Sequence, residues 1–160
     1  MQKGQIAIEF ILIIVIMLIF LQTIIQPTLT SSITTVKDVS SLAQAKIAAE
    51  KIVNAIDFVA LNASDSKIEV GIFLPVNTTL KCDPAAKKIY FSSVVSMPHE
   101  SCEADEDNNA SVCTKSISTI STITLNCNAF GINHTLNPTK NSFYKISVKK
   151  LGGIVYVETK

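Results

Sequence analysis

The chain begins with the stretch Lys3-Gly4-Gln5-Ile6-Ala7-Ile8-Glu9-Phe10, and an apolar run from Ile11 to Leu21 follows it directly. From Ile6 to Leu21 the residues are apolar on every side of a helix apart from the carboxylate of Glu9, and the rest of the chain is interpreted from this segment. The 20 residues from Ile6 to Ile25 rise about 1.5 Å each in an α-helix, so they can cross a hydrocarbon core about 30 Å thick.

Glu9 is the unusual residue of this helix. A carboxylate at the centre of a membrane-spanning helix costs roughly 2.5–3.5 kcal/mol on insertion scales, and less near the interface. A simple membrane anchor gains nothing from such a group. Ionisable residues in spanning helices usually have a function, so we expect Glu9 to have a specific partner.

The segment resembles the class III signal peptide and N-terminal helix of archaeal type IV pilin-like proteins. That pattern has a basic residue, Gly, Gln, a small residue two positions further on, then Glu-Phe and a long apolar helix. The matching residues are Lys3, Gly4, Gln5, Ala7, Glu9 and Phe10. Ala7 stands where Ser is more usual, and the resemblance covers about the first 30 residues.

The resemblance implies that a prepilin peptidase cuts between Gly4 and Gln5 and that the apolar helix stays in the product. Glu9 and Phe10 would then act in assembly of a filament core. The implied partners are copies of the chain itself, the peptidase, a membrane platform protein, a cytoplasmic assembly ATPase, and membrane lipid before assembly. Adhesion is the downstream role that the family suggests.

Elementary electrostatics agrees with this reading of Glu9. Cleavage would leave a positive amine on Gln5, at a helix end that is itself a positive dipole end. A carboxylate from a neighbouring subunit can neutralise that amine in apolar surroundings and set the axial register. Either partner alone would cost several kcal/mol when buried, so we expect the two charges to pair.

Two other interpretations of the N-terminus are open. A secretory signal peptide would be removed after the apolar run, but Gln22 to Pro27 shows no convincing small-x-small cleavage site. A plain signal anchor would leave Glu9 without a role. Lys3 is the only charge before the run, which favours the N-terminus in the cytoplasm and the bulk of the chain outside.

Length and charge limit the remaining classes. The 160 residues allow one compact domain and a stalk, and the net charge is +1 with 14 lysines and no arginine. A nucleic-acid-binding protein would show a basic face with arginine and interleaved aromatics, and none is present, so we expect no nucleic-acid partner.

Two features after the apolar run indicate an extracellular domain. The cysteines are even in number: Cys82, Cys102, Cys113 and Cys127. Candidate glycosylation sites of the form Asn-x-Ser/Thr occur at Asn62, Asn77, Asn109 and Asn133. Any one of these asparagines can equally be an ordinary loop residue.

Four cysteines allow three pairings, and we favour the nested one. Cys102 and Cys113 enclose an acidic loop with little else to hold it. Cys82 and Cys127 lie at a predicted strand entrance and strand exit. The pairing Cys82–Cys127 with Cys102–Cys113 is therefore expected, and the other two remain open.

The apolar helix is predicted to continue in an amphipathic half. Pro27 should kink or break it, because proline removes a hydrogen bond and clashes with the preceding turn. Beyond it an apolar stripe recurs at steps of three and four: Leu29, Ile33, Val36, Val39, Leu42, Ala45, Ala49, Ile52, Ile56 and Val59. We expect this stripe to pack against a globular head, and the helix to end at residues 62–66.

After residue 66 the pattern alternates, which predicts strands. The expected strands are 68–74, closed by Pro75, then 88–95, a bulged or edge strand over 116–125, and a hairpin of 144–148 with 154–158 turning at Gly152-Gly153. The fold class is therefore α+β: a long N-terminal helix with a C-terminal antiparallel β head.

The sequence contains no pattern typical of a metal site or of a catalytic site. His99, Cys102, Cys113 and Cys127, with His134 in reserve, lack the close cysteine pairs of structural zinc sites. The acidic run 105–109 lacks the spacing of an EF-hand loop, so a solvated loop is the simpler reading. No nucleophile motif or phosphate-binding glycine loop is present, so we expect no enzyme, no cofactor and no metal. Phe91, Phe130 and Tyr156 could serve adhesion but are more often core residues.

The expected organisation is a leader 1–4, a hydrophobic membrane or filament-core helix 5–26, an amphipathic continuation 27–62, and an extracellular β-rich head 63–160. The expected function is a pilin of a surface filament, held in the cell membrane as a precursor. A non-polymerising, membrane-anchored ectodomain that binds a ligand or senses a signal is the alternative, and a protein freed by a signal peptidase is a third.

Overall fold

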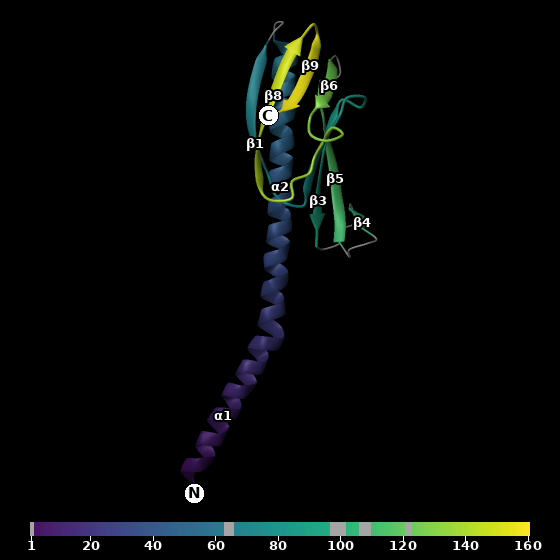
Figure 1. Cartoon of the computed structure of the whole chain (residues 1–160). Coiled ribbons are helices and arrows are strands. Elements are labelled where there is room, and N and C mark those ends of the chain that lie inside the picture. The colour runs from purple at the N-terminus through teal and green to yellow at the C-terminus, as the bar shows by residue number, and fades with distance from the viewer. Residues whose placement is uncertain (1, 63–65, 97–101, 106–109, 121–122) are drawn as a thin grey trace. The chain divides into compact units, whose positions relative to one another are not determined.

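A computed structural model of the chain describes residues 2–62, 66–96, 102–105, 110–120 and 123–160, with side chains described from Ile8 onward except in 103–105 and at 110. The chain divides into two units at Lys37. It is α+β, with one long N-terminal helix followed by two β-sheets, as the sequence predicted (Figure 1).

The first unit is helical throughout its described residues. Helix α1 spans Gln2–Phe20, a π-helical turn η1 spans Leu21–Ile25, and helix α2 spans Gln26–Leu61 and continues into the second unit. Of the kink or break predicted at Pro27, the break is wrong, because the helix continues through the proline, and the π-turn places an irregularity directly before it. The amide of Gln26 donates to the carbonyl of Leu21 across the wider π-turn, which re-spaces the backbone just before the proline and lets the helix continue.

The second unit holds α2 from Asp38 onward and two sheets. The four-stranded sheet has the order β1 (Lys67–Leu74), β8 (Ser142–Leu151), β9 (Ile154–Thr159) and β6 (Thr124–Ala129). The five-stranded sheet has the order β4 (Glu103–Asp105), β5 (Ala110–Ser118), β3 (Lys88–Val95), β2 (Thr78–Asp83) and β7 (Thr135–Leu136).

Three strand predictions are confirmed. β1 and β3 lie where the alternation placed them, and β8 turns into β9 through Gly152 and Gly153. The two glycines have φ of +56° and +82°, conformations that residues with a side chain rarely adopt, so this two-residue turn requires glycine.

The predicted strand 116–125 is wrong, because those residues belong to two strands in different sheets. β5 ends at Ser118, and the amide of Ile120 donates to the Asp57 carboxylate of α2 at 3.0 Å. That bond turns the chain away from its pairing with β3 in the five-stranded sheet. β6 then begins at Thr124 in the four-stranded sheet. β6 then pairs with β9 in parallel, which departs from an all-antiparallel head.

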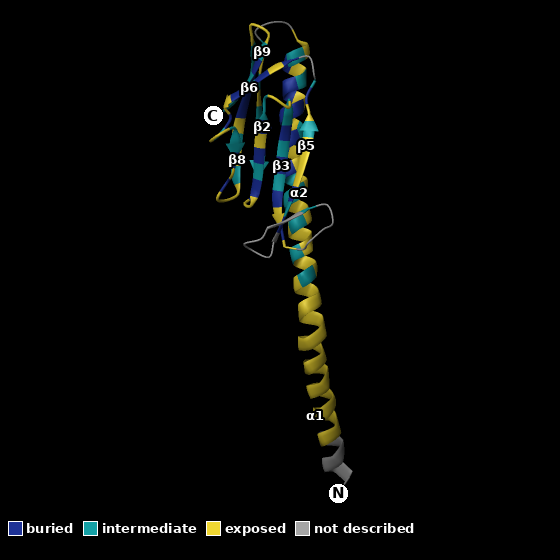
Figure 2. Cartoon of the chain, turned by 90° about the vertical axis from the view of Figure 1, so that its right-hand side faces the viewer, coloured by how far each residue is buried: buried dark blue, intermediate teal, exposed yellow. Residues whose placement is uncertain are grey.

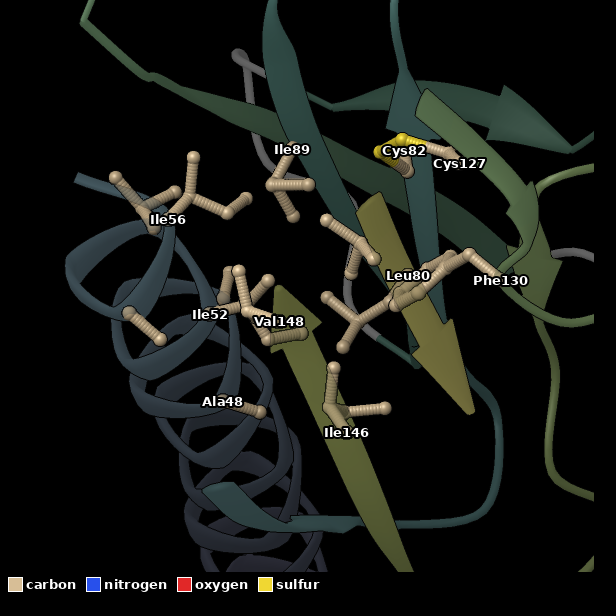
Figure 3. Close-up of a cluster of buried hydrophobic side chains, with 14 of the residues drawn as sticks. Ala48, Ile52, Ile56, Leu80, Cys82, Ile89, Cys127, Phe130, Ile146 and Val148 are labelled. Atoms are coloured by element: carbon tan, nitrogen blue, oxygen red, sulfur yellow. A yellow bond between two sulfur atoms is a disulfide. The ribbon is translucent and has the colours of Figure 1, made fainter. Parts of the chain in front are cut away.

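One hydrophobic core joins α2 to the buried faces of both sheets. Its helix residues recur at the predicted spacing, with Ile52 and Ile56 fully buried. Figure 3 shows these side chains directed toward Leu80, Ile89 and Val148. Among the residues of the predicted stripe, Leu42 is the first that is half-buried, whereas Leu29, Ile33, Val36 and Val39 are exposed.

Candidate assembly surface

The N-terminal helix exposes its apolar side chains all round. From Ile8 to Leu21 every large apolar residue is between 42% and 67% exposed, which Figure 2 shows as a continuous exposed surface along α1. The helix from Ile8 onward is long and apolar enough to cross a membrane, and no residue of its most apolar stretch is buried. Apolar surface of this extent requires a covering, either lipid or protein.

Glu9 lies on this surface, directly before Phe10, and both are exposed. Gly4 and Gln5 lie in α1, in the part whose side chains are not described. No charged residue follows Glu9 until Lys37. Glu9 is therefore the one charged residue of the helix between Ile8 and Val36.

Residues 23–35 of this helix contain several threonines and serines whose hydroxyls form hydrogen bonds within the helix itself. Their side-chain oxygens donate to backbone carbonyls one turn earlier, as in Thr23 to Ile19 at 2.7 Å and Thr28 to Ile24 at 2.7 Å. The same pattern holds for Thr30, Ser32, Thr34 and Thr35. Hydroxyls bonded in this way can enter apolar surroundings at little cost, so the apolar surface effectively continues past Pro27.

Sequence reasoning missed this extension, although a signal for it was present. Threonine and serine at positions 23, 28, 30, 32, 34 and 35 each have a carbonyl four residues earlier within the same helix. Leu29 and Ile33 within this segment and Val36 after it are exposed. They join α1 as part of one candidate assembly surface, residues 8–36.

Both favoured disulfides are confirmed in the head. Cys82 of β2 is joined to Cys127 of β6, and Cys102 is joined to Cys113 of β5. The first bond connects the two sheets at the edge of the core, as Figure 3 shows. The second holds the chain entering β4 against β5. These bonds occupy every sulfur of the zinc alternative, and His99 lies outside the described residues.

His134, the reserve zinc ligand, has Nδ1 at 2.8 Å from the Cys127 carbonyl oxygen. No group of three potential metal ligands occurs among the described side chains. In the acidic run, Asp105 lies in β4 and residues 106–109 lie outside the described part.

Three of the four candidate glycosylation sites lie on exposed turns or ends. Asn62 follows the last turn of α2, where its side-chain amide donates to the Phe58 carbonyl at 2.7 Å. Asn77 and Asn133 occupy turns with φ of +61° and +51°, a conformation that asparagine tolerates well. All three are exposed, and Asn109 lies outside the described residues. Their modification stays a prediction.

The aromatic candidates for adhesion divide between core and surface. Phe91 and Phe130 are buried in the core, and Tyr156 is half-buried on the outer face of β9. Phe143 is 83% exposed and packs against Phe73 of the adjacent strand, with ring centroids 4.8 Å apart and ring planes tilted by 54°. Phe143 was not singled out from the sequence.

Comparisons of the chain with protein-family models, with curated proteins and with solved structures found no match.

Proposed function

We propose that this chain is a pilin, the structural subunit of an archaeal type IV pilus-like surface filament. A prepilin peptidase would cut after Gly4, and the subunit would assemble from the membrane through its N-terminal helix. Adhesion is the role proposed for the assembled filament, with a platform protein and an assembly ATPase as partners.

One observation supports the proposal: the large apolar residues of the helix from Ile8 to Val36 are exposed, this stretch has no charge beyond Glu9, and a disulfide-bonded head follows it. Lipid can cover such a surface first, and identical helices can cover it later. An apolar helix that exchanges lipid for protein gains little hydrophobic energy, so close packing and the Glu9 carboxylate would provide specificity.

The test is mass spectrometry of the N-terminal peptide from protein isolated from its native membrane or surface. A terminus at Gln5 supports processing by a prepilin peptidase. An intact Met1 or Gln2 would overturn the proposal in favour of a non-polymerising membrane-anchored ectodomain. A terminus near or beyond Pro27 would mean a secreted protein released by a signal peptidase.

Electron microscopy of the same material provides the second readout. Filaments that react with an antibody to the head, in a sample whose peptide begins at Gln5, are the expected result. A processed subunit that never polymerises in cells carrying the assembly machinery would contradict the filament function.

A further inference from the structure

A hollow of about 400 Å³ lies on the outer face of the five-stranded sheet. Its lining comes from four strands of that sheet, β2, β3, β5 and β7. We call it the hydroxyl groove, because most of the side chains that line it end in a hydroxyl. They include Thr79, Lys81, Tyr90, Ser92, Thr114 and Thr135.

The alternation of the strands explains why these side chains face outward. In β2 the core takes Leu80 and Cys82, and in β3 it takes Ile89 and Phe91. Successive side chains of a strand point to opposite faces, so the residues between them face away from the core. Figure 2 shows the alternation as bands of colour along β2 and β3.

The strand register places the lining side chains next to one another. Thr79 pairs with Ser92, and Ser92 pairs with Thr114, so three hydroxyls form a row across β2, β3 and β5. In the next row Tyr90 pairs with Lys81. Neighbouring strands lie about 4.8 Å apart, so a ligand that rests on the groove meets a polar group at each strand.

The side chains of these two rows have free hydrogen-bonding capacity. None of the five makes a side-chain hydrogen bond or an ion pair within the part of the chain that the structure describes. Asp83, also in the lining, uses Oδ1 for the amides of Ala85 and Ala86, at 3.0 and 2.9 Å. A hydroxyl both donates and accepts, so the groove offers donors and acceptors side by side.

The chemistry of the lining matches an uncharged ligand with many hydroxyls. Lys81 is the one cation and Asp83 the one anion among the described lining residues, so their charges cancel. The same residues include no aliphatic side chain, so an apolar helix or strand of a second copy would gain little from binding there. Sugar hydroxyls can pair with the threonine and serine hydroxyls, and the half-buried ring of Tyr90 offers an apolar surface to the C–H groups of a sugar ring.

We infer that the hydroxyl groove binds a neutral hexose polysaccharide, with Tyr90 against one sugar ring and Ser92, Thr79 and Lys81 as hydrogen-bond partners. This names a ligand class for the proposed adhesion, and the inference rests on that proposed function for its biological role. A shallow groove that replaces water with hydrogen bonds binds weakly by itself. Repetition of the groove along a filament would raise the overall affinity through multivalency.

Two candidate glycosylation sites determine which residues the test can change. Thr79 is the third residue of the motif at Asn77, and Thr135 is the third residue of the motif at Asn133. Replacing either threonine would remove a glycosylation motif together with a groove hydroxyl, so both stay unchanged. The protein would also be produced in a host that does not glycosylate asparagine, which prevents a glycan of the head from competing for the groove.

Binding would be measured with immobilised full-length protein in a detergent without a sugar headgroup, by biolayer interferometry. Mannan, dextran and galactan are the neutral probes, and polygalacturonate is the anionic one. We expect at least one neutral polymer to bind, and Tyr90→Ala to weaken that binding about tenfold, since contact with an aromatic ring is worth about 1 kcal/mol. Tyr156→Ala, at a half-buried tyrosine of the other sheet, is the matched control and should bind as wild type does.

A second variant blocks the groove without touching the core. Thr114 is exposed on β5, so Thr114→Arg should fill part of the hollow and abolish binding while the thermal midpoint stays unchanged. Thr124→Arg, at an exposed threonine of β6, should bind as wild type does. Binding that survives both Tyr90→Ala and Thr114→Arg would place the ligand elsewhere and overturn the inference.

Three further outcomes would also overturn it. One is that none of the three neutral polymers binds, and another is that only polygalacturonate binds. The third is that Thr114→Arg changes the oligomeric state in detergent while no polymer binds, which would make the groove a contact between copies. Because binding is measured on the solubilised chain, it does not depend on processing after Gly4. A chain that binds a polymer but keeps Met1 would retain this inference and lose the filament proposal.

Discussion

Glu69 shows how one exposed carboxylate comes to depend on its neighbours. It lies on edge strand β1 and accepts from lysines on β1, on β8 and after β9. Because these contacts favour the ionised form, the pKa of Glu69 is lowered in the folded chain relative to the unfolded chain. The contribution of Glu69 to stability is therefore present above its ordinary pKa of about 4.3 and is lost as the pH falls below that value.

We predict that Glu69→Gln makes the stability of the head less sensitive to acid. The wild-type thermal midpoint should fall more between about pH 6 and about pH 3 than that of the variant. Below the ordinary pKa the unfolded wild-type chain takes up a proton at Glu69, whereas the folded chain, whose carboxylate three lysines hold ionised, does not. Circular dichroism of full-length protein in detergent micelles measures both. Glu50→Gln is the control, since Glu50 forms a single long ion pair, with Lys46 at 3.6 Å, among the described residues. Equal acid sensitivity of Glu69→Gln and wild type would contradict the prediction.

Ile52 and Ile47 are equally hydrophobic residues of one helix that differ in how far they are buried. Ile52 is fully buried against both sheets, while Ile47 is 51% exposed one turn and a half earlier. We predict that Ile52→Ala lowers the free energy of unfolding by about 2–5 kcal/mol, since it leaves a cavity that the core fills only in part. Ile47→Ala should change it by about 0.5 kcal/mol or less. Denaturant unfolding of the full-length protein measures both, and similar losses would mean that Ile47 is covered as well.

At the scale of elements, the two disulfides differ in what they join. Cys82–Cys127 joins residues 45 positions apart in the sequence and links the two sheets. Cys102–Cys113 joins residues 11 positions apart, beside one edge strand. In the loop-entropy model these are worth about 4 and about 3 kcal/mol.

We therefore predict a larger loss of stability for the Cys82→Ala, Cys127→Ala double variant than for the Cys102→Ala, Cys113→Ala double variant. Removing the first bond also frees the two sheets to separate, so its unfolding transition should become less cooperative. Chemical denaturation followed by circular dichroism gives midpoint and slope. The reverse order of stabilities would show that the short acidic loop, and not the link between sheets, limits the fold.

The C-terminal end of α2 is capped from the sheet. Lys150 Nζ donates to the carbonyls of Ala60 at 2.7 Å and Asn62 at 2.9 Å. A cation at this end also meets the negative end of the helix dipole.

Lys150→Met should accordingly cost about 1–2 kcal/mol, because it removes two charge-assisted hydrogen bonds and keeps the length of the side chain. Lys140→Met, at an exposed turn position, is the matched control and should cost little. Amide hydrogen exchange in the last turn of α2 would localise the loss; unchanged protection there would contradict the capping role.

At the scale of the whole molecule, apolar side chains are buried within the head but exposed along the N-terminal helix. Apolar residues of α2 are packed in the core from Leu42 onward, while the large apolar residues from Ile8 to Val36 are exposed in the single chain. In the proposed filament that surface would be covered, and Glu9 is the one carboxylate between Ile8 and Val36.

We predict that Glu9→Gln blocks filament formation while the protein still reaches the membrane in normal amounts. Leaving the neighbouring amine buried without a counter-charge costs about 3–5 kcal/mol, so subunit association should weaken at least about a hundredfold. Filament counts by electron microscopy and membrane levels by immunoblot measure the two effects. Glu50→Gln, a glutamate further along the same helix, should assemble normally. Normal filaments from Glu9→Gln would remove the main residue of the filament proposal.

Part of this structure follows from local sequence. The apolar run, the alternation in β1, β3 and β8, and the Gly152-Gly153 turn each reflect periodicities or backbone preferences of neighbouring residues. The disulfide pairing was also predictable, because it followed the positions of the cysteines relative to those strands. The strand β2 had a signal that was missed, since Thr78, Leu80 and Cys82 alternate and are buried.

Other features were decided only by contacts between distant residues. Residues 116–125 look like one strand, but the Asp57 carboxylate of α2 takes the Ile120 amide and divides them between two sheets. The parallel pairing of β6 with β9 and the gathering of three lysines around Glu69 likewise depend on which strands become neighbours. Periodicity records which side of an element is apolar. What covers that side depends on the tertiary structure, because the free energy of burial belongs to the pair of surfaces and not to either one alone.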